Sequence, residues 1–560
     1  MAWCTPLGDS LDEVWSALLA GESAIREVPG RLRLRSRLAA PLPATWPSEE
    51  EGGNRPADRH RAVAVATVAA ALGDAGLSGQ AGSANASSGI LLVLGTSLGP
   101  HLDGLNEHPV RLGDWARQVA DEVGTGRPPL SLSSACSSGA DAIGLGARLV
   151  RSGRARVCVA GGIDLLTAAK LLGHSALGTM SKDGLRPFHE GRDGTVLGEG
   201  AAFLVLEPEA AATARGARSR GRVLGYGAAN EAGPHTSTDA SGGTAATAIR
   251  AALADAAALP SQVSVVSAHA TGTVMNDAAE VAAVGQVFLG TSNRPQLLAT
   301  KASLGHGLGA TGAIEAVTVL LALERGWVPP VLGGPTDPSL ALSVAEGHPA
   351  PVQEGIGLSL NLGFGGFTSC VALGSASHRP GRVRRAGEVA GVRTSARFEL
   401  SEPSVVAIAA GRSGTYADPV AWLISSTVLQ LLAQVGDEDS RGRTGLIVAS
   451  ETATAETMRD VAAAAVHGRV SPMRFAAASP GTVVGVACAT AGLRGPALLL
   501  TTRGDDPVPA QLVADLWLED ETEAGVRPDR VARMLVVGHA QDATGRHTVQ
   551  GLVRELVALA

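Results

Sequence analysis

Short apolar runs that alternate with longer mixed segments dominate the first 375 residues of this 560-residue chain. The runs at 157–160, 265–268 and 297–299 have the length and composition of buried strands. The segments 11–19 and 140–150 have helical length instead, and Ser10 stands where a residue that begins the first helix is expected. This alternation predicts an α/β fold with many tight strand-to-helix turns.

A turn of small polar residues interrupts this pattern and carries a thiol. The run Ser131–Gly139 contains Cys136 and leads directly into the helix expected over 140–150. A cysteine so placed lies at the positive end of a helix, where unpaired amides favour the thiolate and can hold an oxyanion. We therefore interpret Cys136 as a candidate nucleophile, whereas Cys158, inside an apolar run, is predicted to be a core residue.

Two loops downstream each place a histidine at the end of an apolar run. His269 follows the run 265–268, and His306 follows the run 297–299 with Lys301 five residues before it. Both loops are rich in Gly and Thr, which lets backbone approach a ligand closely. Two histidines in matching positions indicate a site. His174 and His189 lie in a polar segment and are predicted to be solvated.

These residues resemble the β-ketoacyl synthases, the thiolase-fold condensing enzymes of fatty acid and polyketide synthesis. Four blocks occur in the family's order over residues 5–375. They are the cysteine block at Cys136, the His-x-Thr-Gly-Thr block of His269, Thr271 and Thr273, the Lys-x-x-x-Gly-His block of Lys301 and His306, and the loop Gly363–Gly366. The resemblance implies an α/β thiolase-like fold of duplicated α-β-α-β-α layered halves, with halves at residues 1–207 and 208–376.

The resemblance also implies a mechanism. Cys136 would accept an acyl group from a phosphopantetheine thioester, and malonyl on an acyl carrier protein would then lose carbon dioxide. His269 and His306 would stabilise the resulting enolate, and the backbone N–H groups of Cys136 and Phe364 would hold the tetrahedral oxyanion. The product would be a β-ketoacyl thioester.

Further roles follow from the same resemblance. Lys301 would be a buried lysine with Glu280 as its carboxylate partner. Phe364, followed by Gly365, would be a gating aromatic that swings to admit the acyl chain. No metal or redox cofactor is implied, because the thioester supplies the activation. The implied partners are acyl carrier protein and, as a homodimer or heterodimer, a ketosynthase-like subunit.

The same scaffold suggests two other functions, and a third, that of a thiolase, is disfavoured. An acyltransferase could use Cys136 to form an ester or amide without decarboxylation. A non-catalytic chain-length partner subunit is a second alternative, although such subunits usually lack the cysteine. A thiolase is disfavoured because Cys370 lies on the far side of the loop Gly363–Gly366 from the position that a second catalytic cysteine requires.

About 180 residues extend beyond one condensing unit. We predict a basic linker at 377–400 and, at 401–560, a partial, non-catalytic copy of the first half of the fold. Strands are expected at 405–410, 445–450, 497–501 and 534–537, and helices at 420–435 and 455–466. When 494–499 is laid on 127–132, Arg503 falls where Cys136 stands, so this copy has no nucleophile there.

Composition limits the remaining possibilities. The hydrophobic fraction is 45% with 3% aromatic residues, and the net charge of −7 comes without a basic stripe, so neither nucleic acid nor a membrane is an expected partner. Five scattered cysteines predict a reduced, cytoplasmic protein. Two departures from the family pattern stand out: Ala270 replaces a usual glycine, and only Met1–Cys4 precede the first block where an apolar strand is normal.

Overall fold

The computed structural model describes residues 1–29, 32–43, 56–78, 89–102, 111–233, 238–291, 294–340, 343–378, 392–402, 416–436, 438–519 and 531–556. The strands are β1 (Ala2–Cys4), β2 (Arg26–Glu27), β3 (Leu38–Ala40), β4 (Ile90–Gly95), β5 (Leu130–Ser133), β6 (Val157–Asp164), β7 (Leu197–Gly198), β8 (Gly200–Leu206), β9 (Arg222–Asn230), β10 (Val263–Ser267), β11 (Gln296–Leu298), β12 (Trp327–Val328), β13 (Ala350–Pro351), β14 (Ile356–Gly363), β15 (Phe367–Gly374), β16 (Val392–Glu402), β17 (Thr444–Ser450), β18 (Ala497–Leu500), β19 (Arg533–Gln541) and β20 (His547–Leu556).

The α-helices cover the strands and end the loops that carry the site. They are α1 (Leu11–Leu19), α3 (Pro56–Asp74), α4 (Asp114–Val123), α5 (Ser138–Arg151), α6 (Ala168–Leu177), α7 (Glu209–Ala214), α8 (Gly243–Asp255), α9 (Val274–Phe288), α10 (Lys301–Leu304), α11 (Thr311–Arg325), α13 (Pro419–Val435), α14 (Ala455–Val466), α15 (Pro472–Ala478), α16 (Thr482–Ala491) and α17 (Val508–Glu519). Short 3-10 turns include η2 (Ala135–Ser137) and η4 (Leu308–Ala310).

Three five-stranded units with one topology form the two large sheets of the described residues, beside the small sheets β12-β13 and β2-β3-β7. Within each unit the strands, numbered by their order along the chain, lie side by side in the order first, fifth, fourth, second, third. The units are β1-β8-β6-β4-β5, β9-β15-β14-β10-β11 and β16-β20-β19-β17-β18. In each, the fifth strand is antiparallel to both of its neighbours, and the fourth, second and third are parallel. The fold is therefore one supersecondary unit used three times.

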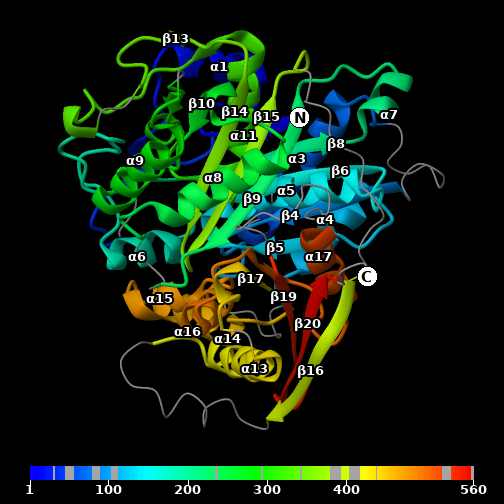
Figure 1. Ribbon diagram of the computed structural model, residues 1–560. Coiled ribbons are helices and arrows are strands. Elements are labelled where there is room, and N and C mark those ends of the chain that lie inside the picture. Colours follow the sequence, from blue (N-terminus) through cyan, green and yellow to red (C-terminus); the bar gives the residue numbers. More distant parts are fainter. Residues whose placement is uncertain are drawn as a thin grey trace.

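The first and third units join edge to edge. Strand β5 pairs antiparallel with β18, with Leu132 opposite Leu500 and Ser133 opposite Leu499. The backbone N–H of Thr501 also donates to the carbonyl of Ser131 at 2.8 Å. The result is a continuous ten-stranded sheet, whose β16–β20 half forms the lower part of the molecule in Figure 1. We call residues 392–556 the C-terminal module.

Layers of helix and sheet alternate through the first two units. Helices α5 and α11 pack against each other between the ten-stranded and the five-stranded sheets, α3 and α4 cover the outer face of the first, and α8 and α9 cover the second (Figure 1). This is the α-β-α-β-α layering that the resemblance implied. In the C-terminal module, α13 and α16 cover one face of the sheet, and α17 covers the other and contacts α5.

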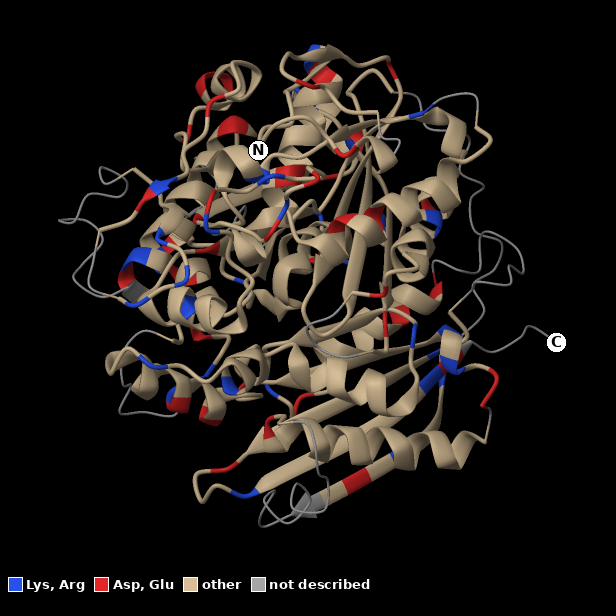
Figure 2. Cartoon of the chain, turned by 90° about the vertical axis from the view of Figure 1, so that its left-hand side faces the viewer, with Lys and Arg blue, Asp and Glu red and all other residues tan. Residues whose placement is uncertain are grey.

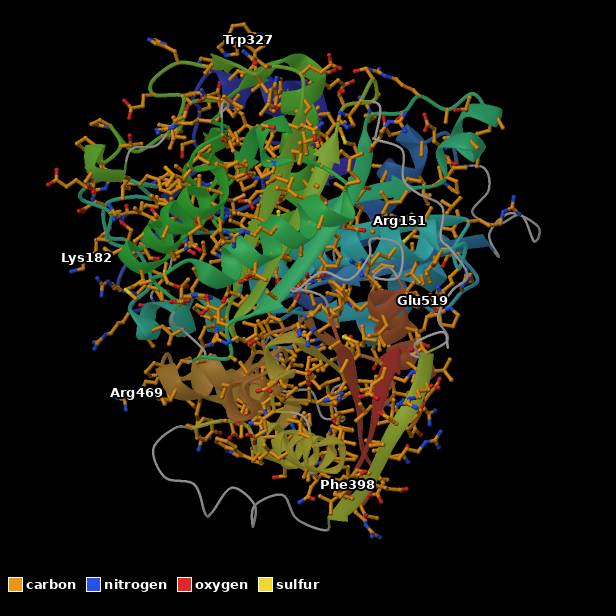
Figure 3. The ribbon with its side chains drawn as sticks, in the orientation of Figure 1. Arg151, Lys182, Trp327, Phe398, Arg469 and Glu519 are labelled. Carbon is orange, nitrogen blue, oxygen red and sulfur yellow. The ribbon has the colours of Figure 1, made fainter. Side chains whose placement is uncertain are left out.

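Most of the elements predicted for the C-terminal region are present, but the predicted end of the linker is wrong. Strands β17, β18 and β19 and helices α13 and α14 lie where they were predicted, while the strand predicted at 405–410 lies outside the described residues. The predicted extent of the linker to residue 400 is wrong, because β16 begins at Val392. Arg393 and Arg397 are the exposed positions of an alternating strand, whose Phe398 is partly buried and labelled in Figure 3. The basic residues are thus the solvent face of a strand.

Charged residues lie mainly on the outer helices and loops, whereas the central strands are almost wholly uncharged (Figure 2). Blue and red residues are interspersed on that surface. Within the described part of the chain, no helix is long and apolar enough to cross a membrane.

Candidate active site

The nucleophile turn connects β5 to α5. Ala135 has φ +53°, a left-handed conformation that side-chain-bearing residues adopt rarely, and the 3-10 turn Ala135–Ser137 places Cys136 just before the helix. Ser138 holds the turn because its hydroxyl accepts from the N–H of Ser134 at 3.0 Å. Strain of this kind persists only where the surroundings enforce it, and it often marks a functional residue.

A buried carboxylate fixes the same turn. Asp141, only 2% exposed, accepts hydrogen bonds from the hydroxyls of Ser137 at 2.8 Å and Tyr226 at 2.6 Å, and from Ser134. Ser134 and Ser137 flank Cys136 in the sequence, so Asp141 ties both sides of the nucleophile turn to the second unit through Tyr226. Sequence reasoning did not single out Asp141, although an acid among small residues in the first turn of a predicted helix was a usable sign.

The structure brings Cys136, His269 and His306 together. The sulfur and one ring nitrogen from each histidine lie within 4.8 Å of one another, and all three residues are buried. The two imidazole rings are 5.2 Å apart and nearly perpendicular. His269 follows β10, and His306 lies between α10 and η4, where its backbone pairs with Val196 and Gly198. Three segments far apart in the sequence thus converge on one point.

The geometry settles the tautomer of His306. Its Nδ1 accepts a hydrogen bond from the backbone N–H of Leu308 at 3.2 Å and lies 3.0 Å from the hydroxyl of Thr311. Because Nδ1 is an acceptor, the proton of the neutral ring is on Nε2. Burial, with the charge of Lys301, holds the pKa of both His269 and His306 well below the usual 6.5. Both rings are therefore neutral at pH 7.

Burial opposes the thiolate that the helix end favours at Cys136. Burial raises the pKa of the Cys136 thiol from 9.0 to about 12, and the charge of Asp164 adds to that rise. Lys301 and a hydrogen bond from the backbone N–H of Phe364 act in the opposite direction but do not offset desolvation. The cost of burying a charge is the largest influence on this thiol.

Lys301 does not pair with Glu280, which corrects the partner that the resemblance implied. Its Nζ lies 2.5 Å from Oε1 of Glu315 in α11, and both side chains are 1% exposed. The other oxygen of Glu315 accepts from Asn361 at 2.6 Å. Glu315 stands in a helix that is otherwise almost entirely apolar, so an unexplained acid facing a buried lysine was the sign that sequence reasoning missed.

Glu280 instead holds the histidine loop. Its carboxylate accepts from the backbone N–H groups of His269 at 2.5 Å and Ala270 at 2.6 Å, and from Asn276 at 2.8 Å. Burial raises the pKa of Glu280 to about 8, and the nearby charge of Asp277 contributes to the rise. Three N–H donors to the side chain of Glu280 fix the direction in which the loop presents His269.

The same loop contains the two threonines of the motif and its unusual alanine. Thr273 caps α9, because its hydroxyl accepts from the N–H of Asn276 at 3.4 Å, and it lies 3.0 Å from the hydroxyl of Thr271. Ala270 has φ +43°, the left-handed conformation in which glycine is unstrained. The backbone thus keeps the glycine conformation despite the methyl group.

The loop Gly363–Gly366 lies directly on the nucleophile turn. A Cβ at Gly363 would lie 2.6 Å from the carbonyl oxygen of Ser134 and 3.2 Å from the amide nitrogen of Cys136. The backbone of Phe364 comes close enough to Cys136 to act to lower the pKa of its thiol. Gly365 has φ +90°, and its carbonyl accepts from the side chain of Asn230 at 3.1 Å. The loop backbone at Gly363 is therefore packed against the backbone on both sides of Ala135.

His174 is not solvated, contrary to the prediction. It lies in α6, is 6% exposed, and its ring stacks on that of Phe364 with centroids 6.1 Å apart and planes at 28°. Burial lowers the pKa of His174 to about 4. The surrounding polar residues suggested an exposed loop, whereas the segment forms a helix with a buried face.

Arg503, which takes the position of Cys136 in the C-terminal module, is exposed. It follows β18 by three residues, as Cys136 follows β5, and its guanidinium lies 2.6 Å from Asp505. Cys488 is buried in α16. Within the described residues of this module, no thiol occupies the nucleophile position.

Solved structures that resemble this chain show the class of its fold. The ketosynthase/chain length factor of ishigamide biosynthesis has a similar structure, with a TM-score of 0.60 and 28% identity, over 67% of this chain and 98% of that one. The PfaC keto synthase-chain length factor covers 99% of this chain and 78% of its own, with a TM-score of 0.75 and 15% identity, a likeness of fold alone. The fold is that of the thiolase-like ketosynthases.

Sequence similarity then gives the family. The descriptions "Beta-ketoacyl synthase, N-terminal domain" and "Beta-ketoacyl synthase, C-terminal domain" match residues 1–212 and 220–334. The 3-oxoacyl-[acyl-carrier-protein] synthase 2 of Rhizobium meliloti is 31% identical over 66% of this chain and 96% of its own length. That of Mycobacterium bovis is 36% identical over 43% of this chain, and the match spans 60% of the mycobacterial protein. The chain belongs to the β-ketoacyl synthase family.

Proposed function

We propose that this protein catalyses a decarboxylative Claisen condensation between an acyl group on Cys136 and a malonyl-type thioester on acyl carrier protein, giving a β-ketoacyl thioester in fatty acid or polyketide synthesis. The observation that carries the proposal is the convergence of the Cys136 sulfur with a ring nitrogen of His269 and of His306 within 4.8 Å. A nucleophile and two neutral imidazoles are the groups that the two half-reactions need.

The first half-reaction loads the enzyme. The Cys136 sulfur attacks the thioester carbonyl, and the carrier's thiol leaves as the acyl–Cys136 bond forms. Because the resting group is a thiol with its pKa near 12, its proton must leave during the attack, and a neutral imidazole beside it is a competent acceptor. Lys301, whose charge lowers the pKa of Cys136, favours this step electrostatically.

The second half-reaction forms the carbon–carbon bond. Cleavage of the malonyl carboxylate as carbon dioxide leaves an enolate, and the Nε2–H of His306 is a donor for its oxygen. The enolate carbon attacks the acyl–Cys136 carbonyl, and the tetrahedral oxyanion accepts from the N–H groups of Cys136 and Phe364. Collapse expels the Cys136 sulfur as a thiolate, which takes up a proton from water, because the proton lost in the first half-reaction has left on the carrier's thiol. Loss of one such donor costs about 2.7–4 kcal/mol in other enzymes.

The partners in this proposal are acyl carrier protein, named in the relatives' descriptions, and the C-terminal module as a non-catalytic ketosynthase-like partner within the same chain. Two features support the second assignment: the module repeats the strand order of the first unit, and Arg503 stands at the nucleophile position. The carrier presents the substrate on phosphopantetheine, and the proposed chemistry uses no metal or redox cofactor.

The test is incubation with acyl-loaded and malonyl-loaded carrier protein, followed by intact-mass analysis and measurement of carbon dioxide. We expect an acyl adduct on the wild type, none on Cys136→Ala, and carbon dioxide released with the β-ketoacyl product. Adduct formation followed by ester or amide formation, with no carbon dioxide, would favour the acyltransferase alternative. A Cys-His-His set can also bind zinc, so a parallel reaction contains a chelator, and we expect its rate to be unchanged.

A further inference from the structure

The C-terminal module touches the loop that carries Phe364. A Cβ at Gly485 of α16 would lie 2.6 Å from the carbonyl oxygen of Gly365, so the helix backbone packs directly on the loop. A Cβ at Gly481 would lie 2.9 Å from the ring of Phe367 and 3.0 Å from the carbonyl of Ser133. These two glycines leave no space between the module and the loop.

A second contact reaches the Phe364 side chain itself. Phe475 of α15, 3% exposed, packs over the backbone of Gly173, where a Cβ would lie 2.2 Å from its ring. Its ring meets that of His174 edge to face, with centroids 5.1 Å apart and planes at 73°. His174 in turn stacks on Phe364. Three rings from three segments therefore form a continuous series from the C-terminal module to the loop beside Cys136.

We propose that the C-terminal module restrains the ring of Phe364. In this proposal, Phe475 sets the resting position of that ring through its contact with His174. Phe475 and His174 are positioning residues, because neither is placed in contact with the reacting atoms. The proposal rests on the gating role of Phe364 that the family resemblance implies, and so on the proposed function. Edge-to-face and offset-stacked rings at these separations attract each other beyond the area they bury, so removing one ring frees the next.

The physical consequence is a change in access to Cys136 that depends on the size of the reagent. A small reagent reaches the sulfur without displacement of the Phe364 ring, whereas a bulky one requires the ring to swing aside. Without Phe475 the swung position becomes more populated. The bulky reagent then reacts faster, while the small reagent reacts at about the same rate. Loosened folding would accelerate both reagents together.

The experiment uses the full chain and compares alkylation of Cys136 by N-phenylmaleimide and by iodoacetamide, each followed by intact mass. Cys136→Ala gives the background from the other cysteines, all of which are buried. We expect Phe475→Ala to raise the ratio of the N-phenylmaleimide rate to the iodoacetamide rate about two- to tenfold. Met473→Ala, on the same helix but 48% exposed, is the matched control and should leave the ratio unchanged.

Variants of His174 test the relay independently of the folding of the C-terminal module. His174→Ala should raise the ratio as Phe475→Ala does, whereas His174→Phe, which keeps a ring in place, should retain the wild-type ratio. An unchanged ratio in both alanine variants, or an equal rise of both rates, would overturn the proposal. Alkylation needs no acyl transfer, so a wild type that loads no acyl thioester would refute the proposed function and leave this test intact.

Discussion

Nζ of Lys301 lies 2.5 Å from Oε1 of Glu315, and neither side chain is more than 1% exposed. Breaking a buried pair by removing one partner leaves an uncompensated charge and typically costs about 3–5 kcal/mol. The pair joins the short helix α10, which precedes His306, to α11, which packs between the two sheets. It is therefore a structural support of the histidine loop as well as a source of positive potential at Cys136.

Double-mutant cycles will identify the partner of Lys301. We expect Lys301→Met and Glu315→Gln to show a coupling in the free energy of unfolding of about 2 kcal/mol. The cycle of Lys301→Met with Glu280→Gln should give a value smaller by about 1 kcal/mol or more, because Glu280 accepts from backbone N–H groups instead. Denaturant unfolding measures both cycles. Equal couplings would restore Glu280 as an equivalent partner.

The raised pKa of Cys136 predicts an unusual pH profile. The rate of alkylation by iodoacetamide should still be rising at about pH 10, where a free thiol has reached its plateau, because thiolate remains scarce below a pKa near 12. Lys301→Met removes a charge that lowers this pKa, so it should slow alkylation further at any one pH. Intact mass against pH gives the profile. A plateau near pH 7 would mean that the thiolate is the resting form.

Buried histidines predict loss of stability in acid. His539 lies 2.8 Å from the hydroxyl of Ser450 and 2.9 Å from a ring nitrogen of His547, and burial lowers its pKa from 6.5 to about 3. The unfolded chain binds a proton at His539 below pH 6.5 that the folded chain does not, so stability falls as pH falls from 6.5 towards 3.

At about pH 5 the contribution of His539 to that loss is about 2 kcal/mol. The drop in unfolding free energy between about pH 7 and pH 5 should therefore be smaller in His539→Asn than in the wild type by that amount. His467→Asn, at an exposed position after α14, is the control. Parallel stability curves for wild type and His539→Asn would contradict the assignment.

A single methyl group probes the junction of the units. A Cβ at Gly113 would lie 2.3 Å from the carbonyl oxygen of Thr501, across the contact between α4 and the C-terminal module. We expect Gly113→Ala to lower the free energy of unfolding by about 1–3 kcal/mol through overpacking. Gly285→Ala, in α9 with nothing within 4 Å, should raise it by about 0.5–1 kcal/mol. Thermal or denaturant unfolding compares the two. A neutral Gly113→Ala would show that the junction is loose.

Local pattern was sufficient to predict the three residues that converge at the candidate site. Cys136, His269 and His306 each follow a short apolar run in a loop of small residues, and that arrangement is legible without tertiary information. The partner of Lys301 was not predictable from local pattern. Helix α11 brings Glu315 to Lys301 from 14 positions away in the sequence, whereas Glu280, which matched a family pattern, also lies near Lys301 in space. Distance in the folded structure, and not spacing in the sequence, decides whether Glu280 or Glu315 pairs with Lys301.

Residues with mixed surroundings were misjudged for a related reason. Arg393 and Arg397 look like linker residues until β20 supplies the neighbour that makes β16 an edge strand. His174 looks solvated until Phe475, some 300 positions later in the chain, covers it. The effect of burial on the pKa of Cys136 is not legible from the sequence, because desolvation depends on everything packed around the sulfur. In each case the deciding contacts come from residues distant in the sequence.

The pairing of β5 with β18 has a consequence for how the molecule is assembled in the cell. Because both strands belong to one polypeptide, the catalytic units and their neighbour are made in strict one-to-one proportion by a single round of translation. Dilution cannot separate them, and a damaged copy of either cannot be replaced by exchange with a second molecule. The two parts are therefore inherited together, and natural selection acts on them jointly.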